Sequence, residues 1–152
     1  MRFYIPKILI LYYSRTGNTE KMAEAVAQGA GVIQDVETEI KFHATPEELA
    51  NAHAIIIGVP TYHHDMTVDI KNLFEKIAFK NINFKNKIGA AFGSYGWSGE
   101  AQRLVLEIMK NKFEMQLIEP PLLVKYAPDE AAFEKCRKLG KKIAEKLILS
   151  TK

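Results

Sequence analysis

The sequence has little of several features that mark secreted and membrane proteins. It contains a single cysteine, Cys136, so no disulfide can form within the chain, and we expect a reducing compartment, the cytoplasm. It has no run of about 18 apolar residues, and we therefore expect no membrane-spanning helix. The opening residues, MRFYIPK, lack the apolar core of about 7–15 residues that a signal peptide contains.

A strong charge of either sign is also lacking. The net charge is +3 over 152 residues, which is a small excess for a protein that binds nucleic acid. The late basic segment KCRKLGKK, residues 135–142, is expected to be a solvated helix face, with a docking surface for an acidic partner as the alternative. Hydrophobic residues make up 47%, enough for a sizeable core, and the length suits one domain over residues 1–152.

Apolar runs and helical patterns alternate along the chain. Nearly continuous apolar runs, typical of a parallel sheet covered on both faces, predict strands at residues 7–13, 54–60 and 87–94. An alternating run predicts an edge strand at 36–42, and a last strand at 115–124 is expected to be bent or interrupted at Pro120-Pro121. Helical patterns lie between and after the strands, at about 18–30, 45–52, 70–77, 101–109 and 133–147.

This alternation predicts a doubly wound α/β fold, a five-stranded parallel sheet with helices on both faces. In such sheets ligands bind beyond the carboxyl ends of the strands, where the strand order reverses. Three loops are expected to meet there, at residues 13–19, 60–66 and 94–99.

The first of these loops, YSRTGNT, leads into a predicted helix. Free backbone N–H groups and the helix dipole make such a place an anion site, and hydroxyls from Ser14, Thr16 and Thr19 add donors. The loop matches neither G-x-x-x-x-G-K-[ST] nor G-x-G-x-x-G, so a terminal phosphate monoester fits it better than a triphosphate or a pyrophosphate. An ordinary N-cap rich in hydroxyls is the alternative.

The other two loops, PTYHHDM and GSYGWSG, place large aromatic side chains among turn residues. Tyr62 lies in one loop, and Tyr95 and Trp97 lie in the other. Aromatics at the mouths of adjacent strands can hold a flat ring between them, while loop N–H and C=O groups contact its polar edge. Together with the phosphate loop, they predict a planar ring that carries a phosphate tail.

These motifs resemble those of the flavodoxins. SRTGNT resembles the phosphate loop S/T-x-T-G-x-T, and GVPTYHHD lies where that family has its first flavin-covering loop. GSYGWSGEA is similar to the third loop, in particular to that of the flavodoxin-like domain of flavo-diiron (A-type) flavoproteins. The resemblance spans essentially the whole chain, matches a short-chain form and implies noncovalently bound FMN. Carried over by position, the cofactor-binding residues would be Ser14, Arg15, Thr16, Gly17, Asn18 and Thr19 for the phosphate, and Pro60, Thr61, Tyr62, His63, His64, Ser94, Tyr95, Gly96, Trp97 and Gly99 for the ring.

The resemblance implies an electron-transfer protein that shuttles electrons between redox partners, an acidic ferredoxin or an oxidoreductase among them. We expect no catalytic residue, no metal site, no nucleic acid and no membrane. The alternative is an FMN-dependent NAD(P)H:quinone or oxygen reductase, for which no nucleotide-binding motif is visible. A response-regulator receiver domain shares the fold, but it needs an aspartate where the third strand ends in Gly58-Val59-Pro60.

Overall fold

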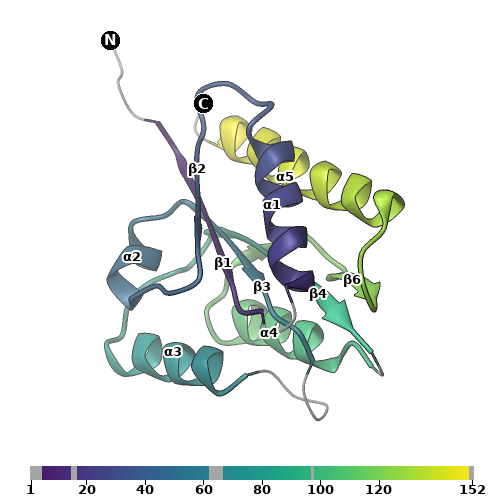
Figure 1. Ribbon diagram of the computed structural model, residues 1–152. Helices are drawn as coiled ribbons and strands as arrows, with labels where there is room; N and C mark the ends of the chain where they lie inside the picture. Colours follow the sequence, from purple (N-terminus) through teal and green to yellow (C-terminus); the bar gives the residue numbers. More distant parts are fainter. Residues whose placement is uncertain (1–4, 15–16, 62–66, 97, 151–152) are drawn as a thin grey trace.

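The computed structural model describes residues 5–14, 17–61, 67–96 and 98–150. Within these residues, six strands form one sheet in the order β2-β1-β3-β4-β5, with β6 also paired to β4 (Figure 1). Every pair is parallel. The strands are β1 (Lys7–Tyr12), β2 (Glu37–Lys41), β3 (Ala54–Gly58), β4 (Ile88–Tyr95), β5 (Gln116–Leu117) and β6 (Leu122–Lys125).

The predicted last strand is interrupted, as expected. Its first part, β5, pairs with the beginning of β4 at Ile88 and Gly89, and its second part, β6, pairs with the end of β4 from Phe92 onward. Proline has no N–H to donate to a strand ladder, and the chain leaves the sheet around Pro120. The five expected strands therefore appear as six segments, and β2 is at the edge of the sheet, as its alternating pattern predicted.

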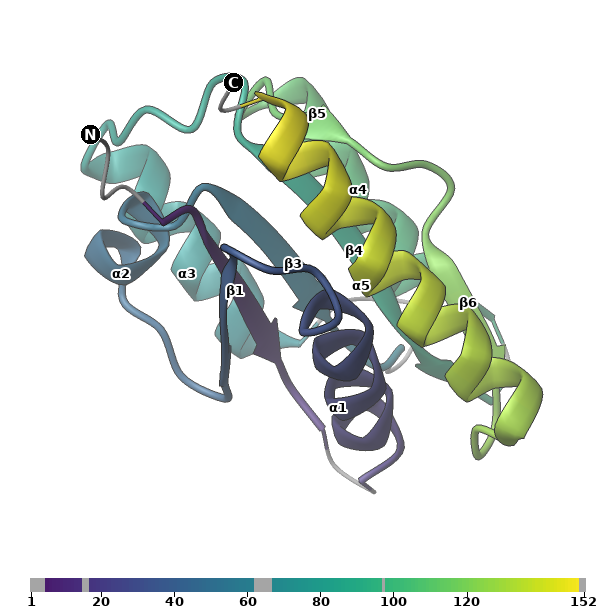
Figure 2. The same ribbon diagram turned by 90° about the horizontal axis from the view of Figure 1, so that it is seen from above.

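Helices cover both faces of the sheet (Figures 1 and 2). Residues that alternate along a strand point to opposite faces. Ile8 and Ile10 of β1 pack in one cluster with the first and last helices, and Leu9 and Leu11 pack in the other with the middle helices. The helices are α1 (Asn18–Ala30) and α5 (Glu130–Ser150) on the first face, and α2 (Pro46–Ala50), α3 (Val68–Phe79) and α4 (Glu100–Asn111) on the second. The predicted doubly wound α/β fold is confirmed.

Helices α1 and α5 pack with their backbones in close contact. A Cβ atom placed on Gly29 would lie 1.8 Å from the Arg137 carbonyl oxygen, and one placed on Gly140 would lie 1.9 Å from the Val26 carbonyl oxygen. Cys136 is fully buried in the same apolar cluster, and burial raises the pKa of its thiol to about 11. The thiol therefore stays protonated at neutral pH and packs as a small apolar group.

The amino ends of β1 and β4 hold a half-buried polar cluster. Nδ1 of His53 accepts a hydrogen bond from the Lys7 backbone N–H at 2.9 Å. Nζ of Lys87 donates to the carbonyl oxygens of Ala50, at 3.0 Å, and Ala52, at 2.5 Å. Burial lowers the pKa of Lys87, and burial together with the nearby Lys87 charge lowers the pKa of His53. Both groups thus lose solvation of their charged forms on folding.

The His53 shift predicts that stability decreases in mild acid. Because its pKa is lowered in the folded state, the unfolded chain takes up a proton first as the pH falls below the ordinary value of about 6.5. The free energy of unfolding should therefore decrease between about pH 7 and pH 5. His53→Asn offers an amide that does not titrate and should flatten this dependence. Urea unfolding at several pH values measures the free energy of unfolding of the parent protein and of His53→Asn. If this free energy changes with pH by the same amount in both proteins, His53 does not cause the effect.

Among the described residues, no helix combines the length and the apolar character needed to cross a membrane.

Candidate functional site

The carboxyl ends of three neighbouring strands bring the predicted loops together. Tyr12 of β1 is in register with Gly58 of β3, which in turn is in register with Phe92 of β4. The alignment continues past β1 and β3, since the Tyr13 N–H donates to the Gly58 carbonyl at 2.9 Å. The strand order reverses at β1, which lies between β2 and β3. The three loops therefore begin side by side at the switch point, where α/β sheets bind their ligands.

The structure places ten of the sixteen predicted cofactor-binding residues. Arg15, Thr16, Tyr62, His63, His64 and Trp97 lie outside the described residues. The ten residues that are described all belong to the three loops or the ends of the elements that flank them. They are Ser14, Gly17, Asn18, Thr19, Pro60, Thr61, Ser94, Tyr95, Gly96 and Gly99.

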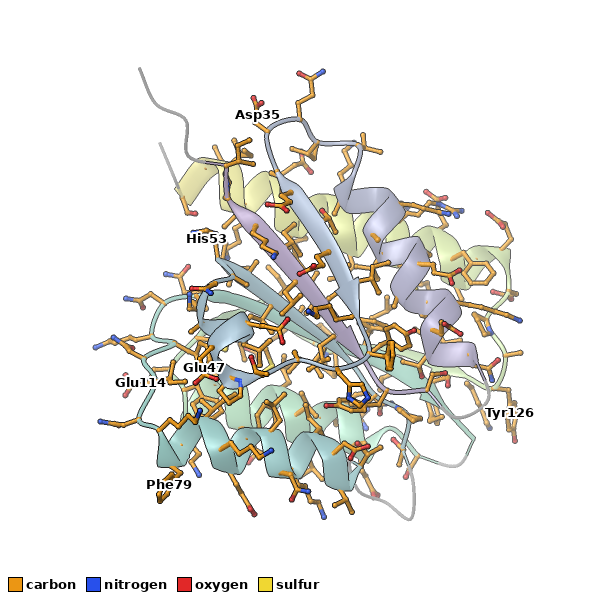
Figure 3. All side chains as sticks on the ribbon, turned by 60° about the vertical axis from the view of Figure 1, so that its left-hand side comes forward. Asp35, Glu47, His53, Phe79, Glu114 and Tyr126 are labelled. Carbon is orange, nitrogen blue, oxygen red and sulfur yellow. The ribbon has the colours of Figure 1, made fainter. Side chains whose placement is uncertain are left out.

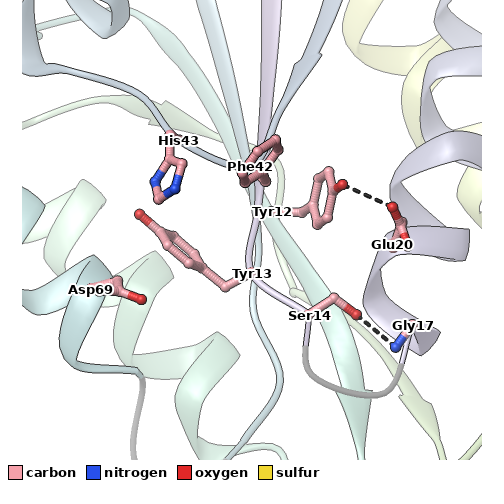
Figure 4. Close-up of a pocket in the computed structure, with 8 residues that line it drawn as sticks. All are labelled: Tyr12, Tyr13, Ser14, Gly17, Glu20, Phe42, His43 and Asp69. Atoms are coloured by element: carbon pink, nitrogen blue, oxygen red, sulfur yellow. Dashed lines mark hydrogen bonds between the residues drawn. The ribbon is translucent and has the colours of Figure 1, made fainter.

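The start of α1 has the geometry of an anion site. Gly17 is the N-cap residue and adopts a left-handed conformation with φ 89°, which favours glycine. Its N–H donates to Oγ of Ser14 at 3.0 Å, so the Ser14 hydroxyl shapes the turn (Figure 4). Glycine has no side chain with which to cap the first helical turn, and backbone N–H groups there are left as donors. This donor set suits a phosphate at the helix N-terminus.

Thr19 connects the first loop to the end of β4. Its side chain is buried, and its Oγ1 atom lies 3.4 Å from Oγ of Ser94, which is also buried. Either hydroxyl can be the donor in this pair. The predicted phosphate loop and the predicted third loop thus touch through two of the predicted residues.

A residue that the motifs do not include links the second and third loops. Gln102, on α4, has a fully buried side chain. Its Nε2 donates to the carbonyl oxygens of Val59, at 2.6 Å, and Ser94, at 3.2 Å, and its Oε1 accepts from the Thr61 hydroxyl at 2.9 Å. The sequence gives a weak indication of this role, because the Gln102 amide lies next to the apolar positions of an amphipathic helix. The hydrogen-bond partners of Gln102 cannot be predicted in this way, because they depend on the fold.

Tyr126 is a second residue that the motifs do not include, and it lies at the rim of the third loop. Its N–H donates to the Tyr95 carbonyl at 2.6 Å, and a Cβ on Gly96 would lie 3.6 Å from its ring. Tyr126 as a residue is 64% exposed, and Nζ of Lys125 lies 5.4 Å from the centroid of its ring. Figure 3 shows Tyr126 on the opposite side of the molecule from His53. An exposed aromatic therefore lies beside the predicted ring site.

A pocket of about 490 Å³ flanks the first loop on the side of β2 (Figure 4). The hydroxyl of Tyr12 donates to Oε2 of Glu20 at 2.9 Å, and the Tyr13 hydroxyl points toward His43. Burial, with a smaller effect of the Asp69 carboxylate, raises the pKa of Tyr13 to about 12. Glu20 and Asp69 make this pocket unsuitable for an anion. Its lining is Tyr12, Tyr13, Ser14, Gly17, Glu20, Phe42, His43 and Asp69, so it shares only Ser14 and Gly17 with the predicted site.

The part of the chain that the structure describes contains no group of three or more His, Cys, Asp or Glu side chains that could hold a metal ion. Two of the four histidines, His43 and His53, fall in that part and lie in different places: His43 packs at 4.7 Å against the ring of Phe42, whereas His53 belongs to the cluster with Lys7.

Comparisons with known proteins relate the chain to flavoproteins. The family model of the flavodoxins matches residues 10–140. The type A flavoprotein fprA of Rhodobacter capsulatus is 37% identical over an alignment of 147 residues, and the alignment covers 92% of this chain and 33% of that protein. A flavodoxin from the Archaea superimposes with a TM-score of 0.85 at 35% identity, covering 93% of this chain and 99% of that one. The rubredoxin oxygen:oxidoreductase of Desulfovibrio gigas superimposes with a TM-score of 0.80 at 28% identity, covering 94% of this chain and 36% of that one. The chain spans about a third of the length of the curated relatives it matches.

Proposed function

We propose that this chain, which belongs to the flavodoxin family and therefore binds FMN, carries electrons between redox proteins in the cytoplasm. The observation that supports this most is that the three loops begin side by side at the switch point, where the first loop leads to the backbone donors of α1. The sequences of the other two loops carry Tyr62, Tyr95 and Trp97. A phosphorylated flat ring fits such a site. When bound, FMN supplies a ring that accepts and releases electrons.

In this proposal the described residues bind and orient the cofactor. Ser14 accepts from the Gly17 N–H and so holds the turn into α1, whose first backbone N–H groups would bind the phosphate. Pro60, Thr61, Ser94 and Tyr95 belong to the loops that would flank the ring. Tyr95 and Tyr126, whose backbones are joined by a hydrogen bond, would lie at the rim of the site, where a partner would approach the flavin edge.

Much of the basic charge lies away from this rim. Lys80 pairs with Glu47 at 2.9 Å, and Lys85 lies 3.9 Å from Glu114. Figure 3 shows Glu47 and Glu114 on the side of the molecule opposite Tyr126. Arg137 on α5 pairs with Glu134 at 3.0 Å and also with Glu130. Lys125, which is exposed next to Tyr126, is a basic residue of the rim itself.

This distribution of charge predicts that the rate of electron transfer depends on salt, and that a substitution of Lys125 reduces this dependence. The rate of electron transfer with an acidic ferredoxin should fall as salt rises, because about 0.1 M salt screens charges beyond roughly 10 Å. Lys125→Gln should lower the rate at low salt and weaken this dependence. The matched control Lys85→Gln, at the far side, should change it less. Stopped-flow rates over a salt series measure both, and a rate that is flat or rises with ionic strength would show that positive charge does not steer docking.

A steady-state assay separates the carrier from the alternative, an NAD(P)H-dependent reductase. The FMN-loaded protein is supplied with NADH or NADPH and with a quinone or oxygen. A carrier should show no turnover above free FMN at the same concentration. Sustained consumption of NADH or NADPH that depends on the protein would show that the chain is a reductase and not a carrier.

A further inference from the structure

We propose that Gln102 is a positioning residue for FMN, which sets the spacing of the two loops that flank the flavin ring. The inference rests on FMN binding at the switch point and adds a residue that does not belong to any of the three loop motifs. Gln102 lies on α4, behind the site, and acts on the ring through the loops that it holds.

The side chain of Gln102 lies between the second and the third loop. The amide nitrogen of Gln102 donates to the last carbonyl before the second loop, that of Val59, and to the Ser94 carbonyl in the third loop. The amide oxygen accepts from the Thr61 hydroxyl, inside the second loop. The same hydroxyl accepts from the Ala101 N–H at 3.3 Å. The second loop is thus held to α4 through two hydrogen bonds, and to the third loop through the amide.

The neighbouring glycine explains why the loops can approach so closely. A Cβ atom on Gly93 would lie 1.8 Å from the Val59 carbonyl oxygen and 2.6 Å from Nε2 of Gln102. The space that this Cβ would fill is taken by the hydrogen bond between the two. Glycine at this position and glutamine at 102 therefore act together to fix the distance between the ends of β3 and β4.

The amide cannot be replaced by an apolar group of the same shape without leaving its partners unpaired. Gln102 is fully buried, so water does not readily take over the bonds to Val59, Ser94 and Thr61. Buried polar groups that lose a partner are unfavourable, and the loops would move to find new ones. The phosphate loop is contacted through the Ser94 hydroxyl, which Gln102 does not bind.

Because Gln102 does not bind the phosphate loop, its loss should affect the binding of riboflavin and of FMN alike. Gln102→Leu should weaken riboflavin and FMN by the same factor, about tenfold or more, which corresponds to about 1.4 kcal/mol. A defect in the phosphate loop would instead weaken FMN alone. Gln28→Leu, an exposed position on α1, is the matched control and should leave both affinities unchanged. Titration of the apoprotein with each ligand gives the dissociation constants, and thermal unfolding of the apoprotein is followed in parallel.

A second variant keeps the test decisive if Gln102→Leu fails to fold. In Gln102→Glu the carboxylate would face the Val59 and Ser94 carbonyls, so burial and repulsion raise the pKa of the new side chain. When protonated, it regains one donor. Riboflavin has no phosphate to titrate, and its affinity for this variant should fall as the pH rises from 5 to 8, whereas the parent protein should show a nearly constant affinity.

The outcomes separate the inference from the function on which it rests. Equal weakening of both ligands by Gln102→Leu, or a pH-dependent riboflavin affinity in Gln102→Glu, supports the positioning role. Unchanged affinities, with or without a lower melting temperature, would overturn it and leave Gln102 as a purely structural residue. A parent protein that binds neither FMN nor riboflavin would instead overturn the proposed function.

Discussion

Replacing Thr16 and Thr19 by alanine is expected to lower the affinity for FMN by about a hundredfold or more while changing the affinity for riboflavin far less. Hydrogen bonds to a charged group each contribute about 1.5–3 kcal/mol, and the phosphate is present only in FMN. Thr19 is buried against Ser94 at the start of α1, so its loss also loosens the contact between the phosphate loop and β4. Fluorescence titration of the apoprotein with each ligand measures the two affinities.

Thr38→Ala provides the control for this pair. Thr38 lies on the edge strand β2, and its hydroxyl belongs to none of the three loops. Its removal should leave both affinities unchanged. If the affinities of the double variant for FMN and for riboflavin fall by equal factors, the phosphate does not bind at the start of α1 and the assignment of the first loop is wrong.

Replacing Gly140 by alanine is expected to destabilise the folded chain by about 2 kcal/mol or more, although alanine favours a helix over glycine by about 1 kcal/mol. The new Cβ would lie 1.9 Å from the Val26 carbonyl oxygen, which is backbone and cannot move aside as a side chain can. Helices α1 and α5 must then separate along their contact. The melting temperature should fall by roughly 4–8 °C, a shift that thermal unfolding followed by circular dichroism resolves.

Gly31→Ala is the matched control, since Gly31 is exposed just after α1 with φ −67°, a conformation that alanine also adopts. Its effect on the free energy of unfolding should stay within about 0.5 kcal/mol. Equal stability of the Gly140 and Gly31 variants would mean that α1 and α5 do not depend on the close backbone contact.

Local patterns predicted the elements of this fold well. The helix expected at 18–30 is α1 with the same bounds, and the helix expected at 45–52 is α2, which begins with a capping box formed by Thr45 and Glu48. Differences are confined to the ends. The strand predicted at 54–60 ends at Gly58, and the helix expected to reach residue 52 ends at Ala50. Terminal residues depend on how the chain leaves the sheet or helix, which periodicity does not determine.

The part of the site that the sequence could not predict consists of contacts between distant segments. Gln102 finds its partners 41 and 43 residues earlier in the chain, at Thr61 and Val59, because α4 packs behind the ends of β3 and β4. Tyr126 reaches Tyr95 only because β6 pairs with the end of β4. A motif records neighbours in sequence, whereas these contacts follow from strand register.

Anaerobic mixing of the FMN-loaded protein with a reduced redox protein tests the central claim, electron carriage, most directly. The flavin absorbance is followed in a stopped-flow instrument after mixing with a reduced ferredoxin and, separately, with NADH or NADPH. A carrier predicts that the ferredoxin bleaches the flavin band at a rate that rises with its concentration, while the nucleotides leave the band unchanged over the same time. Rapid bleaching by a nucleotide, with no reaction with the ferredoxin, would contradict the account.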